Sequence, residues 1–109
     1  MEDLVQVVTT VGSKDEADKI AGALVERRLA ACVQLLGPIQ SIYRWQAKIE
    51  TSQEWMCMIK TTRARYAAVE EAIRQLHSYA VPEILAMPVE RASQDYYRWL
   101  ENEVKADGD

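Results

Sequence analysis

The feature that most constrains this chain is a pair of long extended runs that flank residues 46–48. Residues 33–45 and 48–61 are rich in apolar, aromatic and β-branched residues, which favour β-strands. The short QAK between them predicts a hairpin tip, although it lacks the Asn or Gly that a tight turn prefers. Gly37-Pro38 interrupts the first run, and because proline cannot donate to a strand ladder we expect a bulge or an edge position there. A chain of only 109 residues must therefore accommodate a long hairpin.

The segment before the hairpin predicts one strand and one helix. Residues 4–10, LVQVVTT, are short and β-branched, which is typical of a buried strand. Ser13 and Glu16 have the spacing of a capping box, in which the hydroxyl and the carboxylate each satisfy a free amide of the first turn. Apolar residues then recur at helical spacing, so we expect a helix that runs to about Leu29.

The segment after the hairpin predicts a second helix and a fourth strand. Thr61 or Thr62 is suited to cap the helix, and its apolar stripe ends near His77. Pro82 forbids continuation of the helix and favours an extended chain before it. Residues 83–89, EILAMPV, then predict a strand.

A last helix and a charged tail complete the chain. Ser93 is a predicted N-cap, with Asp95 in the first turn, and residues from about 105 to 109 are expected to be flexible. The order of these elements predicts one domain over residues 1–109. Its fold class is α+β, a ferredoxin-like β-α-β-β-α-β sandwich with a C-terminal helix.

The composition of the chain argues against two classes of partner, nucleic acids and membranes. The formal net charge is -4 and the pI is about 5.0, which argues against nucleic acid, because proteins that bind it show a basic excess. No segment approaches the roughly 20 apolar residues that a membrane helix needs, so no membrane partner is expected. The acidic start, MEDLVQVV, lacks the basic region of a signal peptide. We therefore expect a cytoplasmic protein in which Cys32 and Cys57 are free buried thiols.

Catalytic motifs are absent from the sequence. It contains no G-x-S-x-G, phosphate-binding loop, H-E-x-x-H or C-x-x-C. An acylphosphatase of this fold would need an arginine in the first loop and an asparagine on a middle strand, whereas Asn102 is the only asparagine. An RNA-binding domain of this fold would need exposed aromatic residues on central strands, and residues 4–10 have none. These observations favour a protein that is not an enzyme.

Two features of the sequence can each be interpreted in two ways. His77, the only histidine, with Glu83, fits either the end of a helix, where a histidine can bond free carbonyls, or a metal or ligand site. Tyr43, Trp45 and Trp55 lie on a hairpin too long for the domain to cover. They predict an oligomer interface, with which a ligand cleft is compatible.

Several motifs together resemble one family. LVERRLAACVQL, SIYRWQAKIE, IKTT, LHSYAVPEIL and YYRWL occur in this order, and they resemble the CutA family of divalent-cation tolerance proteins over nearly the whole chain. The resemblance implies a PII-like homotrimer in which the long hairpin of one subunit extends the sheet of the next. It also implies a non-enzymatic role in tolerance of divalent metal ions, with copper binding proposed.

The chain departs from the family at proposed copper ligands. Thr9 stands where some members have a cysteine, and Leu76 stands where they have a second histidine, so His77 is the proposed ligand that remains. We therefore expect weak copper binding through His77. Further departures are Ser78, Ala80 and, at the hairpin tip, Ala47.

The leading hypothesis is a trimeric metal-tolerance protein that requires no cofactor and whose candidate ligand is a divalent cation such as copper. The alternative is a PII-like sensor that binds a small anionic metabolite in a cleft between subunits and signals to a protein partner. A trimer with a purely structural role is a third interpretation. The predicted metal ligands are His77 and Glu83, and the predicted small-molecule contacts are Tyr43, Lys48, Lys60 and Tyr79.

Overall fold

The computed structural model describes residues 4–105, which form a four-stranded antiparallel sheet with three α-helices. This confirms the α+β class. The elements are β1 (Leu4–Val11), α1 (Lys14–Glu26), β2 (Cys32–Trp45), β3 (Lys48–Thr62), the 3₁₀ helix η1 (Arg63–Arg65), α2 (Tyr66–Leu76), β4 (Leu85–Val89) and α3 (Gln94–Glu103). The expected loose tail lies, beyond residue 105, outside the described residues. In residues 4–105 no helix is long and apolar enough to cross a membrane.

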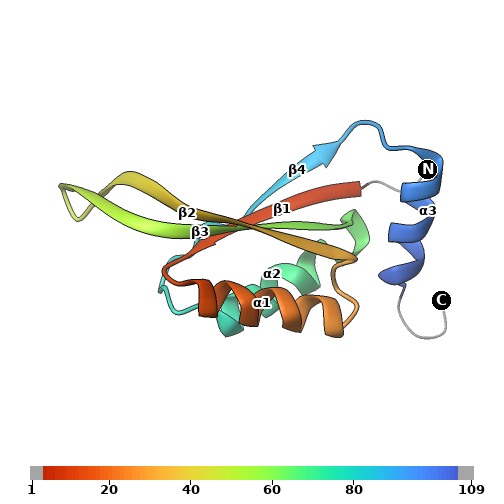
Figure 1. The fold of residues 1–109 in the computed structure, drawn as a ribbon, viewed down its shortest axis with the longest axis horizontal. Coiled ribbons are helices and arrows are strands. Elements are labelled where there is room, and N and C mark those ends of the chain that lie inside the picture. Colours follow the sequence, from red (N-terminus) through yellow and green to blue (C-terminus); the bar gives the residue numbers. More distant parts are fainter. Residues whose placement is uncertain (1–3, 106–109) are drawn as a thin grey trace.

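The sheet has the strand order β2-β3-β1-β4, and each neighbouring pair is antiparallel. Helices α1 and α2 lie along one face, α3 lies at one end, and the β2–β3 hairpin projects beyond the helices as an arm (Figure 1). The molecule measures 47 × 25 × 21 Å, so the arm makes it clearly elongated.

Alternation along β1 and β3 builds the core between the sheet and the two helices. Val7 on β1 and Ile59 on β3 are fully buried, and they pack with Ile20 of α1 and Ile73 of α2. Side chains alternate across a strand, so the odd-numbered residues of these two strands face the helices. A smaller cluster of Leu4, Leu100 and Val104 attaches α3 to the end of the sheet.

The bulge that Gly37-Pro38 predicts is present. Leu36 pairs with Met56 and Ile39 pairs with Glu54, so the two intervening residues of β2 face Trp55 alone. A Cβ atom on Gly37 would lie 2.4 Å from Cδ1 of the Trp55 indole, which explains why this position holds a glycine. The hairpin tip is narrower than expected, because Trp45 pairs directly with Lys48 across a two-residue turn with positive φ angles.

The start of α1 confirms half of the predicted capping box. The Ser13 hydroxyl accepts the backbone N–H of Glu16 at 3.2 Å. The Glu16 carboxylate does not complete the box but accepts the backbone N–H of Ser78 at 2.9 Å and its hydroxyl at 3.0 Å. The local pattern identified the helix start, but the carboxylate bonds to a loop more than sixty residues away.

The end of α1 comes three residues before the predicted Leu29. Arg28 has a φ of 58°, and its N–H bonds the Val25 carbonyl, while Leu29 N–H bonds the Leu24 carbonyl. This is the Schellman pattern, which usually uses glycine at the position of Arg28. The arginine side chain donates to the carbonyls of Asn102 and Glu103, which lie more than seventy residues away, so the residues next to Arg28 do not predict this helix end.

The predicted threonine cap of the second helix is wrong. Strand β3 continues to Thr62, η1 follows, and α2 begins only at Tyr66, without a side-chain cap. The Thr61 hydroxyl instead donates to the Leu29 carbonyl at 2.7 Å and so joins β3 to the loop after α1.

The other predicted boundaries hold more closely. Helix α2 ends with His77 as its C-cap, and the Ser93 hydroxyl accepts the N–H of Tyr96 at 3.4 Å at the start of α3. Strand β4 begins at Leu85, two residues later than expected. Glu83 therefore lies in the loop between α2 and β4.

Candidate binding cavity

His77 lies at the end of α2 with its side chain fully buried. Its Nδ1 accepts the backbone N–H of Tyr79 at 3.1 Å. Because Nδ1 is an acceptor, the neutral ring carries its proton on Nε2, which donates to the Thr10 carbonyl at 2.8 Å. The Glu16 carboxylate is 3.6 Å from Nδ1. The imidazole therefore joins the end of β1 to the loop after α2, as the helix-end interpretation expects.

Tyr79 connects this histidine to the opposite side of the sheet. Its ring centroid lies 4.7 Å from that of His77, and its hydroxyl donates to Oε2 of Glu54 at 2.9 Å. Burial raises the pKa of Tyr79 to about 12, and the hydrogen bond to Glu54 and the charge of that carboxylate act in the same direction. The phenol is therefore neutral at physiological pH and remains a donor.

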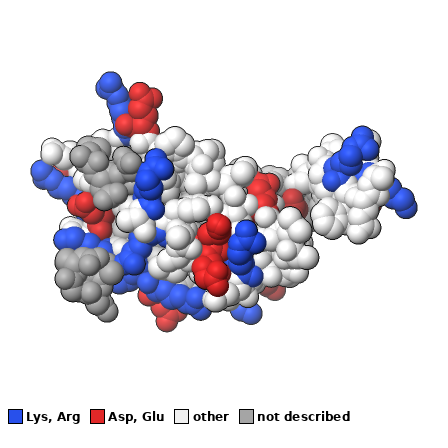
Figure 2. Space-filling model, turned by 180° about the vertical axis from the view of Figure 1, so that it is seen from behind, with Lys and Arg blue, Asp and Glu red and all other residues white. Residues whose placement is uncertain are grey.

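A cavity of about 560 Å³ opens beside Glu54 and Tyr79, where the arm meets the body. Seen from behind, acidic atoms lie at this junction and basic atoms at the tip of the arm (Figure 2). The lining comes from the end of β1, the outer hairpin and the loop after α2: Thr10, Ser41, Ile42, Tyr43, Trp45, Glu54, Tyr79, Ala80, Val81 and Glu83.

The bulge decides which side chains face the cavity. Before it, Leu35 pairs with Cys57 on the helix side of the sheet. After it, Tyr43 pairs with Glu50 rather than with Ile49, because the register has shifted by one residue. Such a shift moves every later side chain to the other face. The bulge thereby brings the odd-numbered residues of outer β2, including Tyr43 and Trp45, to the face that carries Glu54.

The structure brings together only some of the predicted site residues. Tyr43, Tyr79 and Glu83 line the cavity, whereas His77 does not line it and instead contacts Tyr79. Lys48 lies at the tip of the arm. The Lys60 side chain donates a hydrogen bond to the Gln34 side chain. It lines a second cavity, of about 300 Å³, whose lining includes residues of α3.

Sequence reasoning missed Glu54 as a site residue. Its exposure is 6%, although it is a carboxylate on the long hairpin. The one available signal was an acidic residue next to the apolar run WMCMI. A single sequence does not distinguish this from an ordinary exposed position on a strand.

The donors near His77 do not form a metal site within one chain. Among residues 4–105 no group of three or more His, Cys, Asp and Glu side chains could hold a metal ion, and firm sites use three or four ligands. A metal at His77 would also have to displace the bond from Tyr79 or the bond to Thr10. Copper binding through His77 and Glu83 stays a prediction.

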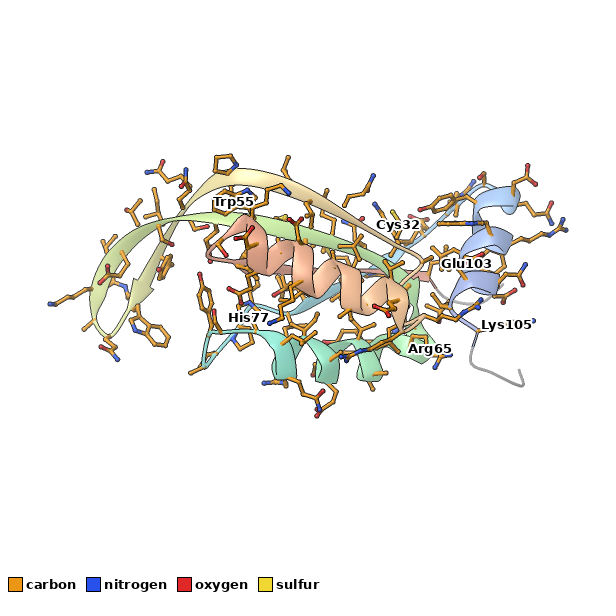
Figure 3. All side chains as sticks on the ribbon, turned by 60° about the horizontal axis from the view of Figure 1, so that its bottom comes forward. Cys32, Trp55, Arg65, His77, Glu103 and Lys105 are labelled. Atoms are coloured by element: carbon orange, nitrogen blue, oxygen red, sulfur yellow. The ribbon has the colours of Figure 1, made fainter. Side chains whose placement is uncertain are left out.

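The two cysteines are free, as expected, but the expectation that both are buried holds only for Cys57. Cys57 is fully buried, and burial raises its pKa to about 11. Cys32 is half-buried and lies on the α3 side of the body, away from His77 (Figure 3). Neither thiol lines the cavity.

The chain is an α+β domain with a projecting hairpin arm and a cavity at the root of that arm. The family model described as CutA1 divalent ion tolerance protein matches residues 5–103. The chain therefore belongs to the CutA1 family of divalent ion tolerance proteins, which confirms the resemblance seen in the sequence.

Known relatives agree with this assignment. The divalent-cation tolerance protein CutA of Thermus thermophilus is 43% identical over 100 residues, which cover 92% of this chain and 95% of that protein. Protein CutA of mouse is 44% identical over 91 residues, which cover 84% of this chain. The match spans only 51% of the mouse protein, so nearly half of that relative lies outside the match.

Solved structures show the same fold. The Thermus thermophilus divalent cation tolerance protein has a TM-score of 0.90 at 41% identity, and the comparison covers 96% of this chain and all of that chain. CutA1 from a psychrotrophic Shewanella has a TM-score of 0.93 at 35% identity, over 96% of this chain and 98% of that one.

Proposed function

We propose that this chain acts in tolerance of divalent cations as a cytoplasmic, non-enzymatic homotrimer. Membership in a family named for divalent ion tolerance supports the role. The strand order β2-β3-β1-β4 and the element order support a ferredoxin-like subunit of a PII-like trimer.

Exposed apolar residues of the outer hairpin and of the loop after α2 support assembly with further copies. Ile42, Ile49 and Val81 are each about two-thirds exposed or more, at 67%, 70% and 71%. Apolar side chains that are this exposed are a liability unless another chain covers them.

The charge of the cavity lining carries the proposal for a cation. Glu54 and Glu83 line the cavity, and no lysine or arginine of residues 4–105 does. A buried carboxylate is costly unless a cation or hydrogen bonds offset its desolvation. The cavity thus suits a cationic ligand, and its carboxylate oxygens are donors of the kind that suits hard ions such as Mn²⁺.

The alternative of an anionic metabolite is supported at a different place. Lys60 and Arg91 both line the second cavity, of about 300 Å³, together with Ser93 at the start of α3. An anionic ligand would find its counter-charges there and not beside Glu54.

Calorimetric titration of the full chain with Mn²⁺ and Cu²⁺ tests the cation proposal. Glu54→Gln keeps the shape and removes the charge, so it should weaken Mn²⁺ binding about tenfold, the equivalent of about 1.4 kcal/mol. Lys48→Gln, at the arm tip, is the matched control and should bind as wild type does. His77→Ala should weaken Cu²⁺ binding if the histidine is a ligand.

Equal Mn²⁺ affinity in wild type and Glu54→Gln would refute a cation site in this cavity. Sedimentation equilibrium tests the assembly independently, and three chains per particle are expected across dilution. A monomer with native circular dichroism would refute the trimer.

A further inference from the structure

We infer that the cavity at the root of the arm binds an organic cation with an alkylammonium head. The inference rests on the proposed function only in placing a cation beside Glu54. It goes beyond that function in the chemical class of the ligand. Three properties of the cavity lead to it: an uncompensated buried charge, aromatic walls, and a volume far larger than a metal ion needs.

The uncompensated charge belongs to Glu54. Its carboxylate is buried, with 6% of the residue exposed, and its hydrogen-bond partner is the neutral Tyr79 hydroxyl at 2.9 Å. No ion pair among residues 4–105 includes Glu54. A phenol satisfies part of the carboxylate's hydrogen-bonding capacity but none of its charge. The ligand that fits is one that brings a positive charge into the cavity.

The aromatic walls determine the kind of positive charge. Tyr43, Trp45 and Tyr79 all line the cavity. The Tyr43 hydroxyl is 3.3 Å from that of Ser52, and the Tyr79 hydroxyl is held by Glu54, so both rings are fixed at their polar ends. Aromatic rings combined with carboxylates recognise ammonium groups through cation–π attraction, in which tryptophan contributes most.

The volume and the apolar lining argue for a cation with carbon around it. About 560 Å³ lies within the range of small-molecule sites. A bare metal ion would occupy a small part of this volume, whereas an organic cation would contact the apolar lining as well as the two carboxylates. Ile42, Ala80 and Val81 complete the lining, and their apolar surface suits the methyl or methylene groups of an alkylammonium ion.

Titration of the full chain with tetramethylammonium chloride, followed through the indole N–H signals in NMR, tests the inference. The expected result is saturable binding that shifts the Trp45 signal. The neutral isostere tert-butanol should bind at least tenfold more weakly, because it lacks the charge. Equal binding of the two probes, or no saturable binding of tetramethylammonium, would overturn the inference.

A matched pair of tryptophan variants locates the site. Trp45 and Trp99 are similarly exposed, at 48% and 43%, but Trp99 lies on α3 and does not line the cavity. Trp45→Leu should weaken tetramethylammonium binding roughly three- to thirtyfold, and Trp99→Leu should leave it unchanged. Equal losses in the two variants would overturn the assignment to this cavity.

Two comparisons of variants distinguish this inference from the proposed function. Glu54→Gln leaves the apolar surface of the arm intact, and it should weaken tetramethylammonium and Mn²⁺ together. Trp45→Leu should weaken tetramethylammonium alone. If Mn²⁺ binds in the predicted way while tetramethylammonium does not, the inference fails and the proposed function stands. If tetramethylammonium binds and Mn²⁺ does not, the inference stands and the metal-binding proposal fails.

Discussion

The inner and outer halves of the β2–β3 hairpin have the same backbone but opposite environments. Ile59 and Ile49 lie ten residues apart on β3 and, by strand alternation, point to the same face. Ile59 is fully buried under the helices, whereas Ile49 is 70% exposed because the helices end before it (Figure 1). The sequence pattern of a strand thus predicts which face a residue points to, and only the neighbouring elements decide whether that face is covered.

The cavity lies where these two halves meet. The bulge opposite Trp55 ends the inner register, and the loop after α2 brings Tyr79 and Glu83 against the first residues of the outer register. A boundary between a packed region and an exposed arm provides both fixed walls and access from solvent. This explains why the candidate site lies at the root of the arm and not within the core.

The largest expected effect comes from comparing the two isoleucines directly. Ile59→Ala should lower the free energy of unfolding by about 2–5 kcal/mol at every protein concentration, because it leaves a cavity in the core. Ile49→Ala should act on assembly alone, so that the proposed trimer dissociates at a dilution at which the wild type stays assembled. Urea unfolding and sedimentation measure the two effects. A loss at Ile49 that equals the loss at Ile59 and does not vary with concentration would contradict the comparison.

A smaller effect is expected at high pH, where a core residue and a cavity residue titrate separately. Burial raises the pKa of Cys57 from its ordinary 9.0 to about 11, so the unfolded chain loses the thiol proton first. Stability should therefore be full below pH 9 and fall by about 2–3 kcal/mol as the pH rises to about 11. Cys57→Ala should flatten the curve over this window.

Tyr79 adds a later window to the same curve. Its pKa is raised from 10.0 to about 12, so its contribution is present below pH 10 and is lost toward pH 12. Tyr79→Phe should remove this part of the decline and leave the earlier part unchanged. Identical curves for wild type and both variants would show that neither group holds its proton more tightly in the folded chain.

The smallest expected effect concerns two buried threonines of the sheet, Thr9 on β1 and Thr61 on β3. The Thr9 hydroxyl is buried and has no hydrogen-bond partner among residues 4–105, whereas that of Thr61 donates to the Leu29 carbonyl. Thr9→Val should raise the free energy of unfolding by about 1 kcal/mol, because it removes an unsatisfied polar group. Thr61→Val is the matched control and should lower stability by a similar amount. Thermal unfolding that gives the same sign for both would count against this account.

The sequence predicted the structural features that depend on residues close to one another in the chain. The order of strands and helices, the Ser13 and Ser93 caps and the bulge at Gly37-Pro38 all follow from local chemistry. Contacts between distant segments were not predictable in this way. The Glu16 carboxylate was assigned to its own helix but holds Ser78, and Thr61 was assigned to α2 but holds Leu29.

The candidate site was predicted in part for the same reason. Tyr43, Tyr79 and Glu83 do line one cavity, but Lys48 and Lys60 do not, and Glu54 was missed. The bulge was foreseen, but its effect on the facing of Tyr43 depends on the pairing partner across the hairpin. The pairing depends on both strands, so the residue pattern of one strand alone does not predict it.

The contact between Gly37 and the Trp55 indole fixes the direction of the whole arm. On either side of it the two strands are regularly paired, so the angle between body and arm is determined at this one point. A methyl group on Gly37 would push the indole aside and alter that angle. In the proposed ring of three identical subunits, every arm would leave its body at this angle, so an error in it would be repeated three times before the ring closes. The closure of the proposed ring would thus depend on the absence of a side chain at Gly37.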